Sequence, residues 1–164
     1  MDISTGNSIN SQVLRLFINA DIVAKDKNGN PVLLVDIKTS TKDAQIHTKI
    51  TDLLAQAHGN IPFGMLADIE KISIFKWGTE HWLEPICVLT TADTLSPYEP
   101  EFRKKRIFYD YFVSLMEAWL SDLAYQWQSS HPPFLEEIKK IGLLEKLDHG
   151  INEQGVDVVE VKLS

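Results

Sequence analysis

The stretch VLLVDIK, Val32 to Lys38, is an apolar strand that ends in an aspartate and a lysine. Side chains alternate between the two faces of a strand, so Asp36 and Lys38 project from the same face. The apolar residues are typical of a strand buried in a sheet, where a charged side chain is unfavourable unless it has a partner. The end of this strand is therefore a candidate functional site.

An Asn28-Gly29 step just before this strand predicts a β-hairpin. A two-residue type I′ turn, with positive φ at both central residues, places Ile22 opposite Val35 and produces one wholly apolar face. The same register places Asp21 directly opposite Asp36. A slip of one residue would destroy the apolar face and separate the two aspartates, so the pattern specifies the register.

Two carboxylates held opposite each other across a hairpin repel. Either one of them takes up a proton or a cation lies between them. Hard carboxylate oxygens suit Mg²⁺ or Mn²⁺, which take few protein ligands and keep several waters. The ammonium of Lys38, on the same face, is placed to stabilise charge that develops on a phosphate. Asp21, Asp36 and Lys38 together are the set that metal-assisted phosphodiester cleavage requires.

The rest of the chain alternates between helical and strand patterns, with no internal repeat or linker. The predicted helices cover 9–18, 42–58, 103–127 and 134–148, and the predicted strands cover 20–25, 32–38, 63–67, 72–77, 86–91 and 156–163. This order predicts an α/β fold with a single mixed β-sheet flanked by helices. The length of 164 residues suits one domain, 1–164.

The composition is that of an ordinary globular protein. A single cysteine excludes a disulfide within the chain, the N-terminal segment lacks the features of a signal peptide, and no apolar run reaches the length of a membrane span. These features predict a cytoplasmic protein with no membrane partner. The net charge of −7 means that a nucleic-acid partner needs a local basic patch. The run RKKR, 103–106, is either such a patch or the solvated start of a helix.

The combination of NAD at 19–21, a hairpin, DIK at 36–38 and a following helix resembles the PD-(D/E)XK nuclease superfamily. The resemblance extends over residues 10–92, which include the strand-turn-strand segment IPFGMLADIEKISIFKWG. It implies a restriction-endonuclease-like core. It also implies hydrolysis of DNA phosphodiester bonds that depends on Mg²⁺ or Mn²⁺.

The resemblance assigns a role to each residue that matches the motif. Asp21 and Asp36 are the metal ligands, the backbone carbonyl of Ile37 is a third ligand, and Lys38 is the catalytic lysine. Gln45 or Lys49, on the helix after the lysine, helps to position the attacking water.

The chain also departs from the superfamily pattern. Many members carry a glutamate on the first helix, where this sequence offers only Asp2 and Gln12. A catalytically inactive nuclease-fold module that binds nucleic acid or protein is therefore the main alternative. A structural homo-oligomer, such as a homodimer formed through an exposed apolar stripe of the 103–127 helix, is a third. A second acid-X-Lys pattern, Glu160 to Lys162, lacks an opposed carboxylate and predicts only a solvated strand face.

Overall fold

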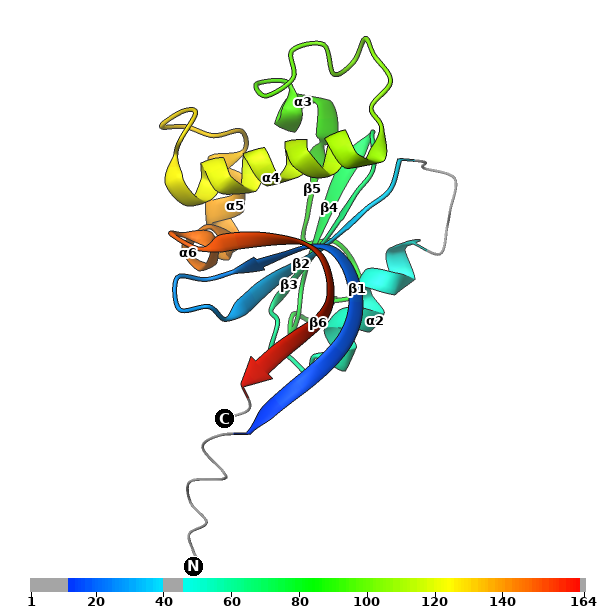
Figure 1. Ribbon diagram of the computed structural model, residues 1–164, viewed down its shortest axis with the longest axis vertical. Coiled ribbons are helices and arrows are strands. Elements are labelled where there is room, and N and C mark those ends of the chain that lie inside the picture. The colour runs from blue at the N-terminus through cyan, green and yellow to red at the C-terminus, as the bar shows by residue number, and fades with distance from the viewer. Residues whose placement is uncertain (1–11, 40–45, 163–164) are drawn as a thin grey trace, which may run out of the picture.

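The computed structural model describes residues 12–39 and 46–162, and these residues form one mixed sheet covered by helices (Figure 1). The strands are β1 Val13–Lys25, β2 Pro31–Ile37, β3 Phe63–Ala67, β4 Lys71–Lys76, β5 Cys87–Thr90 and β6 Ile151–Lys162. The helices are α2 Ile46–Gln56, α3 Thr91–Leu95, α4 Tyr109–Tyr125, α5 Leu135–Lys140 and α6 Leu143–Leu147. The six-stranded sheet of the described residues has the order β5-β4-β3-β2-β1-β6. The predicted α/β class with a single mixed sheet is confirmed.

β2 lies in the middle of this sheet and is buried along its whole length. It is antiparallel to β1 and parallel to β3, and α2 makes the crossover between the two parallel strands. α2 packs on one face of the sheet through Ile50 and Leu54, while α4 covers the other face through Phe112 and Trp119 (Figure 1). Burial on both faces explains why the strand is a continuous apolar run rather than an alternating one.

The predicted helix over 9–18 is wrong for the residues that the structure describes, because 13–18 belong to β1. Burial alternates along this part of the strand: Leu16 and Ile18 are buried, whereas Arg15 and Phe17 are exposed. The period is therefore two, which is that of a strand. β6 pairs with Val13–Phe17 of this extension, so the tertiary partner of the segment lies near the other end of the chain.

The hairpin between β1 and β2 has the predicted register but not the predicted turn. Ile22 pairs with Val35, as expected. The turn is a three-residue loop in which Asp26 N–H donates to the Asn30 carbonyl, and only Gly29 has positive φ, at 85°. The loop is therefore the type I turn with a left-handed glycine, not type I′. A bulge beside Lys25 restores the register, because the apolar face of the hairpin must still meet the core.

The two C-terminal helical predictions are shortened or divided. α4 begins at Tyr109, so the basic run 103–106 lies in the loop before it and does not open the helix. Cations in a first turn oppose the helix dipole, which favours the later start. Gly142, at φ 88°, separates α5 from α6. No helix in the ranges 12–39 and 46–162 combines the length and apolarity needed to cross a bilayer.

The apolar stripe of α4 is in the core. Leu115, Trp119 and Leu123 are all buried against the sheet. The stripe therefore does not provide the exposed surface on which the homodimer alternative was based. The physical reason is that the helix lies across the sheet and buries the stripe itself.

Candidate functional site

The two aspartates and the lysine predicted from the motif meet where β2 ends. The backbone N–H of Lys38 donates to the Ala67 carbonyl at 2.8 Å, which fixes the end of β2 against β3. Lys38 Nζ lies 3.7 Å from Asp36 Oδ2, so the two side chains share a face, as strand alternation predicts. The ladder between β1 and β2 stops at the pair formed by Ile22 and Val35, one position before the aspartates. The site therefore begins where regular pairing ends.

Asp36 is a buried carboxylate whose second oxygen has no hydrogen-bond donor. The residue is 1% exposed, and Oδ2 has no hydrogen-bond partner among the described residues. Burial raises the pKa of Asp36, and the neighbouring Asp21 carboxyl raises it further, against the opposing effect of the Lys49 and Lys38 ammonium groups. The pair thus has the property expected of opposed acids, since one of them needs a proton or a cation.

Asp21 is held by two donors from different parts of the fold. Its Oδ2 accepts the backbone N–H of Ile37 at 2.6 Å, in place of a regular ladder bond. Its Oδ1 accepts the hydroxyl of Tyr109, the first residue of α4. The N–H and C=O of one residue point to the same side of a strand, so the Ile37 carbonyl also faces the Asp21 side. This arrangement directs the carboxylates of Asp21 and Asp36 and the carbonyl of Ile37 toward one point at the end of β2.

Lys49 is the second cation at the site. It lies near the start of α2, and its Nζ is 3.3 Å from Asp36 Oδ1. Each oxygen of Asp36 therefore has a different ammonium nearby, from Lys49 on one side and Lys38 on the other. Both lysines are about one-third exposed at the side chain, at 37% and 36%. Their partly exposed side chains lie between the buried Asp36 carboxylate and solvent.

The donor set fits a small divalent cation. Asp21, Asp36 and the Ile37 carbonyl offer hard oxygen atoms, and Asp36 Oδ2 is the buried atom that lacks a donor. In the described part of the chain, no group of three or more His, Cys, Asp or Glu side chains is arranged to hold a metal. An ion here would therefore keep several waters, which suits Mg²⁺ or Mn²⁺ better than a metal that needs a full set of protein ligands.

Other residues considered in the sequence analysis are either outside the described part of the chain or away from the acid pair. Gln45 and Asp2 lie outside the described residues. Gln12 is exposed just before β1, and the residues that follow it form a strand. Glu160 is exposed on β6 and forms an ion pair with Arg15 at 3.2 Å. Glu160 is therefore on a solvated strand face, as predicted, while the side chain of Lys162 lies outside the described residues.

Tyr109 is the residue of the site that the sequence pattern missed. It lies 88 residues from Asp21 along the chain, and the sequence pattern placed it only within the predicted helix 103–127. Burial raises the pKa of Tyr109, and the Asp21 carboxylate raises it further. The hydroxyl thus keeps its proton and remains a donor to Asp21. No local spacing signals such a contact, because the packing of α4 on the sheet creates it.

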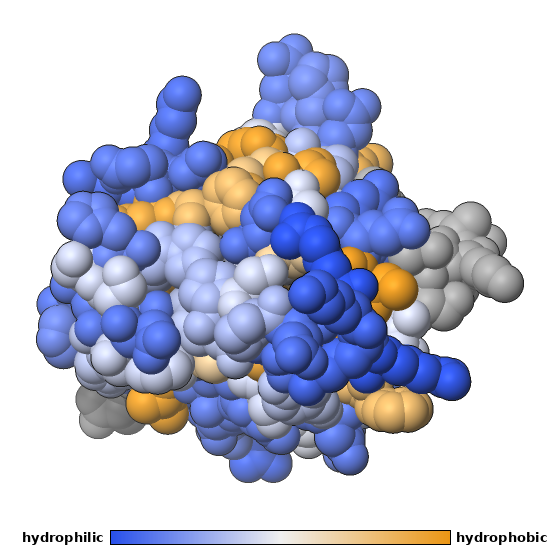
Figure 2. Space-filling model, turned by 90° about the horizontal axis from the view of Figure 1, so that it is seen from above, coloured by the Kyte–Doolittle hydropathy of each residue, from blue (hydrophilic) through white to orange (hydrophobic). Residues whose placement is uncertain are grey.

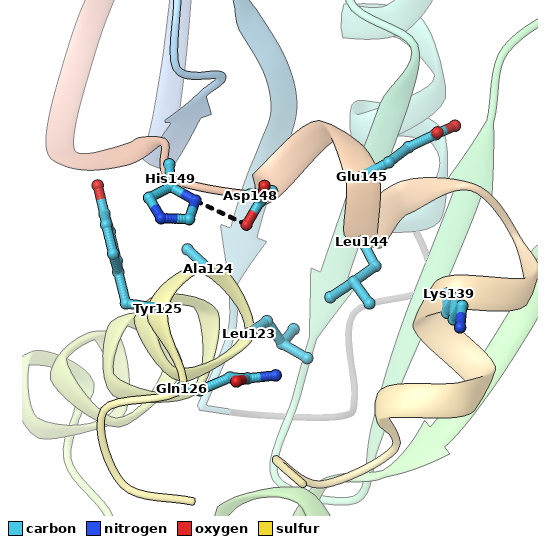
Figure 3. A pocket seen from close by; sticks show the side chains of 9 residues that line it. All are labelled: Leu123, Ala124, Tyr125, Gln126, Lys139, Leu144, Glu145, Asp148 and His149. Carbon is cyan, nitrogen blue, oxygen red and sulfur yellow. Dashed lines mark hydrogen bonds and ion pairs between the residues drawn. The ribbon is translucent and has the colours of Figure 1, made fainter. Parts of the chain in front are cut away.

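A hollow of about 520 Å³ at the other end of α4 is a second place with titratable side chains (Figure 3). His149 Nδ1 lies 2.8 Å from Asp148, and the Tyr125 ring stands beside the imidazole (Figure 3). The residues that line this hollow include no serine or cysteine for the imidazole to activate. α4 has 17 residues, so about 25 Å separates this hollow from Tyr109 and the acid pair. The acid pair is the better candidate site.

The pH dependence of stability tests the environment of Asp36. A pKa raised in the folded state makes a protein more stable as the pH falls through that pKa, and the gain is complete below the unfolded value. Relative to Asp36→Asn, the wild-type free energy of unfolding is expected to rise by about 1.4 kcal/mol for each unit by which the pH is lowered. This rise begins at the raised pKa and ends at the ordinary value of 3.8.

Urea unfolding of both proteins across this range measures the effect. The exposed Asp157 provides the matched control, because Asp157→Asn removes the same charge from a solvated position. A difference between wild type and Asp36→Asn that does not change with pH would show that the carboxyl titrates normally.

Comparison with known proteins found no family model, no curated protein and no solved structure that matches this chain. The chemistry proposed for the acid pair therefore depends on its own geometry.

Proposed function

We propose that this protein is a metal-dependent endonuclease that hydrolyses DNA phosphodiester bonds. The observation that carries the proposal is a buried carboxylate, Asp36, whose Oδ2 lacks a donor while Asp21 lies beside it and Lys38 Nζ is 3.7 Å away. Two acids and a lysine at one strand end is the set required for this reaction. The resemblance of NAD and DIK to the PD-(D/E)XK pattern agrees with it.

Asp21, Asp36 and the Ile37 carbonyl would hold Mg²⁺ or Mn²⁺. A divalent ion held there supplies positive charge to the scissile phosphate and makes a nearby water more acidic. The Ile37 N–H and the Tyr109 hydroxyl fix the orientation of Asp21, so its carboxylate does not have to reorganise when substrate binds. Lys49 holds the other oxygen of Asp36.

Lys38 is the residue that we assign to the attacking water. It follows the last residue of β2, and its side chain reaches Asp36 while remaining partly exposed. An ammonium in this position orients a water by hydrogen bonding and stabilises the negative charge that develops on the phosphate. The proton of the water passes to solvent or to a phosphate oxygen, since the ammonium is already protonated.

A non-catalytic module of the same fold is the second candidate, and the position of Lys49 favours it. Lys49 and Lys38 together balance the charges of Asp36 and Asp21. A cluster that is already neutral has less need of a divalent ion, and a protein of this kind would bind nucleic acid or protein without cleaving it.

Metal-dependent stability separates these two candidates. The wild-type protein is expected to become more stable as Mg²⁺ or Mn²⁺ is added, by about 1.4 kcal/mol for each tenfold increase of free ion above the dissociation constant. Asp36→Asn is expected to lose this response, while Asp157→Asn keeps it. Thermal unfolding followed at several ion concentrations, with EDTA as the reference, is the measurement. The same response in wild type and Asp36→Asn would contradict the metal site.

A further inference from the structure

The loop that leads into α4 concentrates basic and aromatic side chains beside the acid pair. Its sequence, RKKRIFY at 103–109, has four cations followed closely by two exposed aromatic residues. The last residue, Tyr109, donates its hydroxyl to Asp21. Figure 2 looks onto the face of the molecule that carries α4 and shows strongly hydrophilic side chains next to hydrophobic ones there. The loop and the acid pair are therefore neighbours in space.

A hollow of about 560 Å³ lies between the loop and two residues that adjoin the acid pair. Thr39, the residue after Lys38, and Tyr109 line it on the side of the acid pair. Arg103, Lys105 and Arg106 line it on the side of the loop. A ligand lying in this hollow would touch the basic loop and reach the end of β2.

The four cations of the loop are not equally available. Arg103 pairs with Asp93 and Lys105 pairs with Glu99, each at 2.6 Å. The Lys105 ammonium, the Tyr111 hydroxyl and a backbone N–H lower the pKa of Glu99 to about 2, so this acid stays ionised. Lys104 and Arg106, by contrast, have no carboxylate partner within 12–39 and 46–162. They are the cations that an external anion would meet first.

The exposed aromatic rings add a second kind of contact. Phe108 is 65% exposed and Tyr109 is 44% exposed. The Arg106 guanidinium lies 5.1 Å from the centre of the Phe108 ring. A guanidinium within about 6 Å of an aromatic ring centre is attracted to the ring face. This pair offers a flat surface and a positive charge together, which is what an unpaired base and its phosphate fit.

We infer that the 103–109 loop is the binding surface for a single strand of nucleic acid, with Phe108 stacking on an unpaired base and Lys104 and Arg106 contacting phosphates. This inference builds on the proposed nuclease function, since the bound strand would lie against the acid pair. The protein has a net charge of −7, so its attraction for a polyanion must be local. A duplex offers no unpaired face to the Phe108 ring, which is why the loop favours a single strand.

Fluorescence anisotropy with a labelled oligothymidylate of about 15 nucleotides tests the inference. Binding is measured in EDTA, so that cleavage cannot occur. Phe108→Ala is expected to weaken binding about tenfold. The double variant Lys104→Gln/Arg106→Gln is expected to reduce the slope of log affinity against log salt by about 1.4, as two lost phosphate contacts would. The duplex of the same length is expected to bind at least about tenfold more weakly than the single strand.

The matched control is Lys139→Gln/Lys140→Gln, which removes the same charge from exposed positions on α5, away from the loop. It is expected to bind like wild type. The affected side chains of the loop variants are exposed, and unchanged thermal unfolding verifies their folds. Equal binding by wild type, Phe108→Ala and the double variant would overturn the inference, as would equal binding of duplex and single strand.

Different results would contradict the nuclease function and the binding role of the 103–109 loop. Asp36→Asn is included in the binding measurement, and it is expected to bind the oligonucleotide at least as well as wild type, because the loop is intact and a nearby negative charge is gone. Loop-dependent binding with no Mg²⁺-dependent cleavage by wild type, of either the single-stranded oligonucleotide or plasmid DNA, would overturn the nuclease alone. Nicking by wild type with binding that ignores the loop would overturn the loop alone.

Discussion

Asp36→Asn is expected to lower the rate of Mg²⁺-dependent nicking of supercoiled DNA by about 100-fold or more. The substitution keeps the shape of the side chain but removes the charge that would hold the ion, and metal-ion catalysis contributes several kcal/mol of transition-state stabilisation. The effect on folding is expected to have the opposite sign. Asp36 is 1% exposed with an oxygen that lacks a donor, so the neutral amide removes an unfavourable buried charge.

Because Asp36→Asn is expected to lower activity without lowering stability, measuring both separates a loss of catalysis from a loss of folding. Nicking is followed on agarose gels with purified wild type, Asp36→Asn and Asp157→Asn, each with Mg²⁺, Mn²⁺ or EDTA. A variant that is inactive yet at least as stable as wild type has lost chemistry and not structure. Nicking that persists at the wild-type rate in Asp36→Asn would identify a contaminating nuclease or a different active site.

Lys38→Met is expected to lower the same rate by about 100-fold, whereas Lys49→Met lowers it by about tenfold. Positioned groups that handle the proton and charge of the nucleophile contribute about 10²–10⁴-fold. Lys38 Nζ is 3.7 Å from the oxygen of Asp36 that has no donor, and Lys49 Nζ is 3.3 Å from the other oxygen. We therefore propose that Lys38 orients the attacking water and that Lys49 holds the Asp36 carboxylate in position.

Methionine is used because it keeps the length and apolar stem of lysine while removing the ammonium. The two lysines are nearly equally exposed, so each variant is the structural control for the other. Equal losses in the two variants would mean that the lysines act only by balancing the charge of the aspartates. A larger loss in Lys49→Met would exchange their roles.

Much of the architecture follows from local sequence pattern. The strands at 63–67, 72–77 and 86–91 were predicted within about one residue, because short apolar runs bounded by turn residues specify them. The register of the hairpin also followed from its apolar face, even though the turn itself was of another type. The strand predicted over 20–25 lies within β1, whereas the helix predicted over 9–18 is wrong for 13–18, because that part of β1 is held by β6, which is distant in sequence.

The sequence by itself determined that Asp21, Asp36 and Lys38 would be brought to one strand end, because alternation and register are properties of neighbouring residues. Only the tertiary structure decided what surrounds them. The Tyr109 hydroxyl reaches Asp21 across 88 residues, and the basic loop before α4 lies beside the pair, because α4 packs across the face of the sheet. Contacts of this kind depend on how helices are laid on the sheet, and no spacing within the chain encodes them.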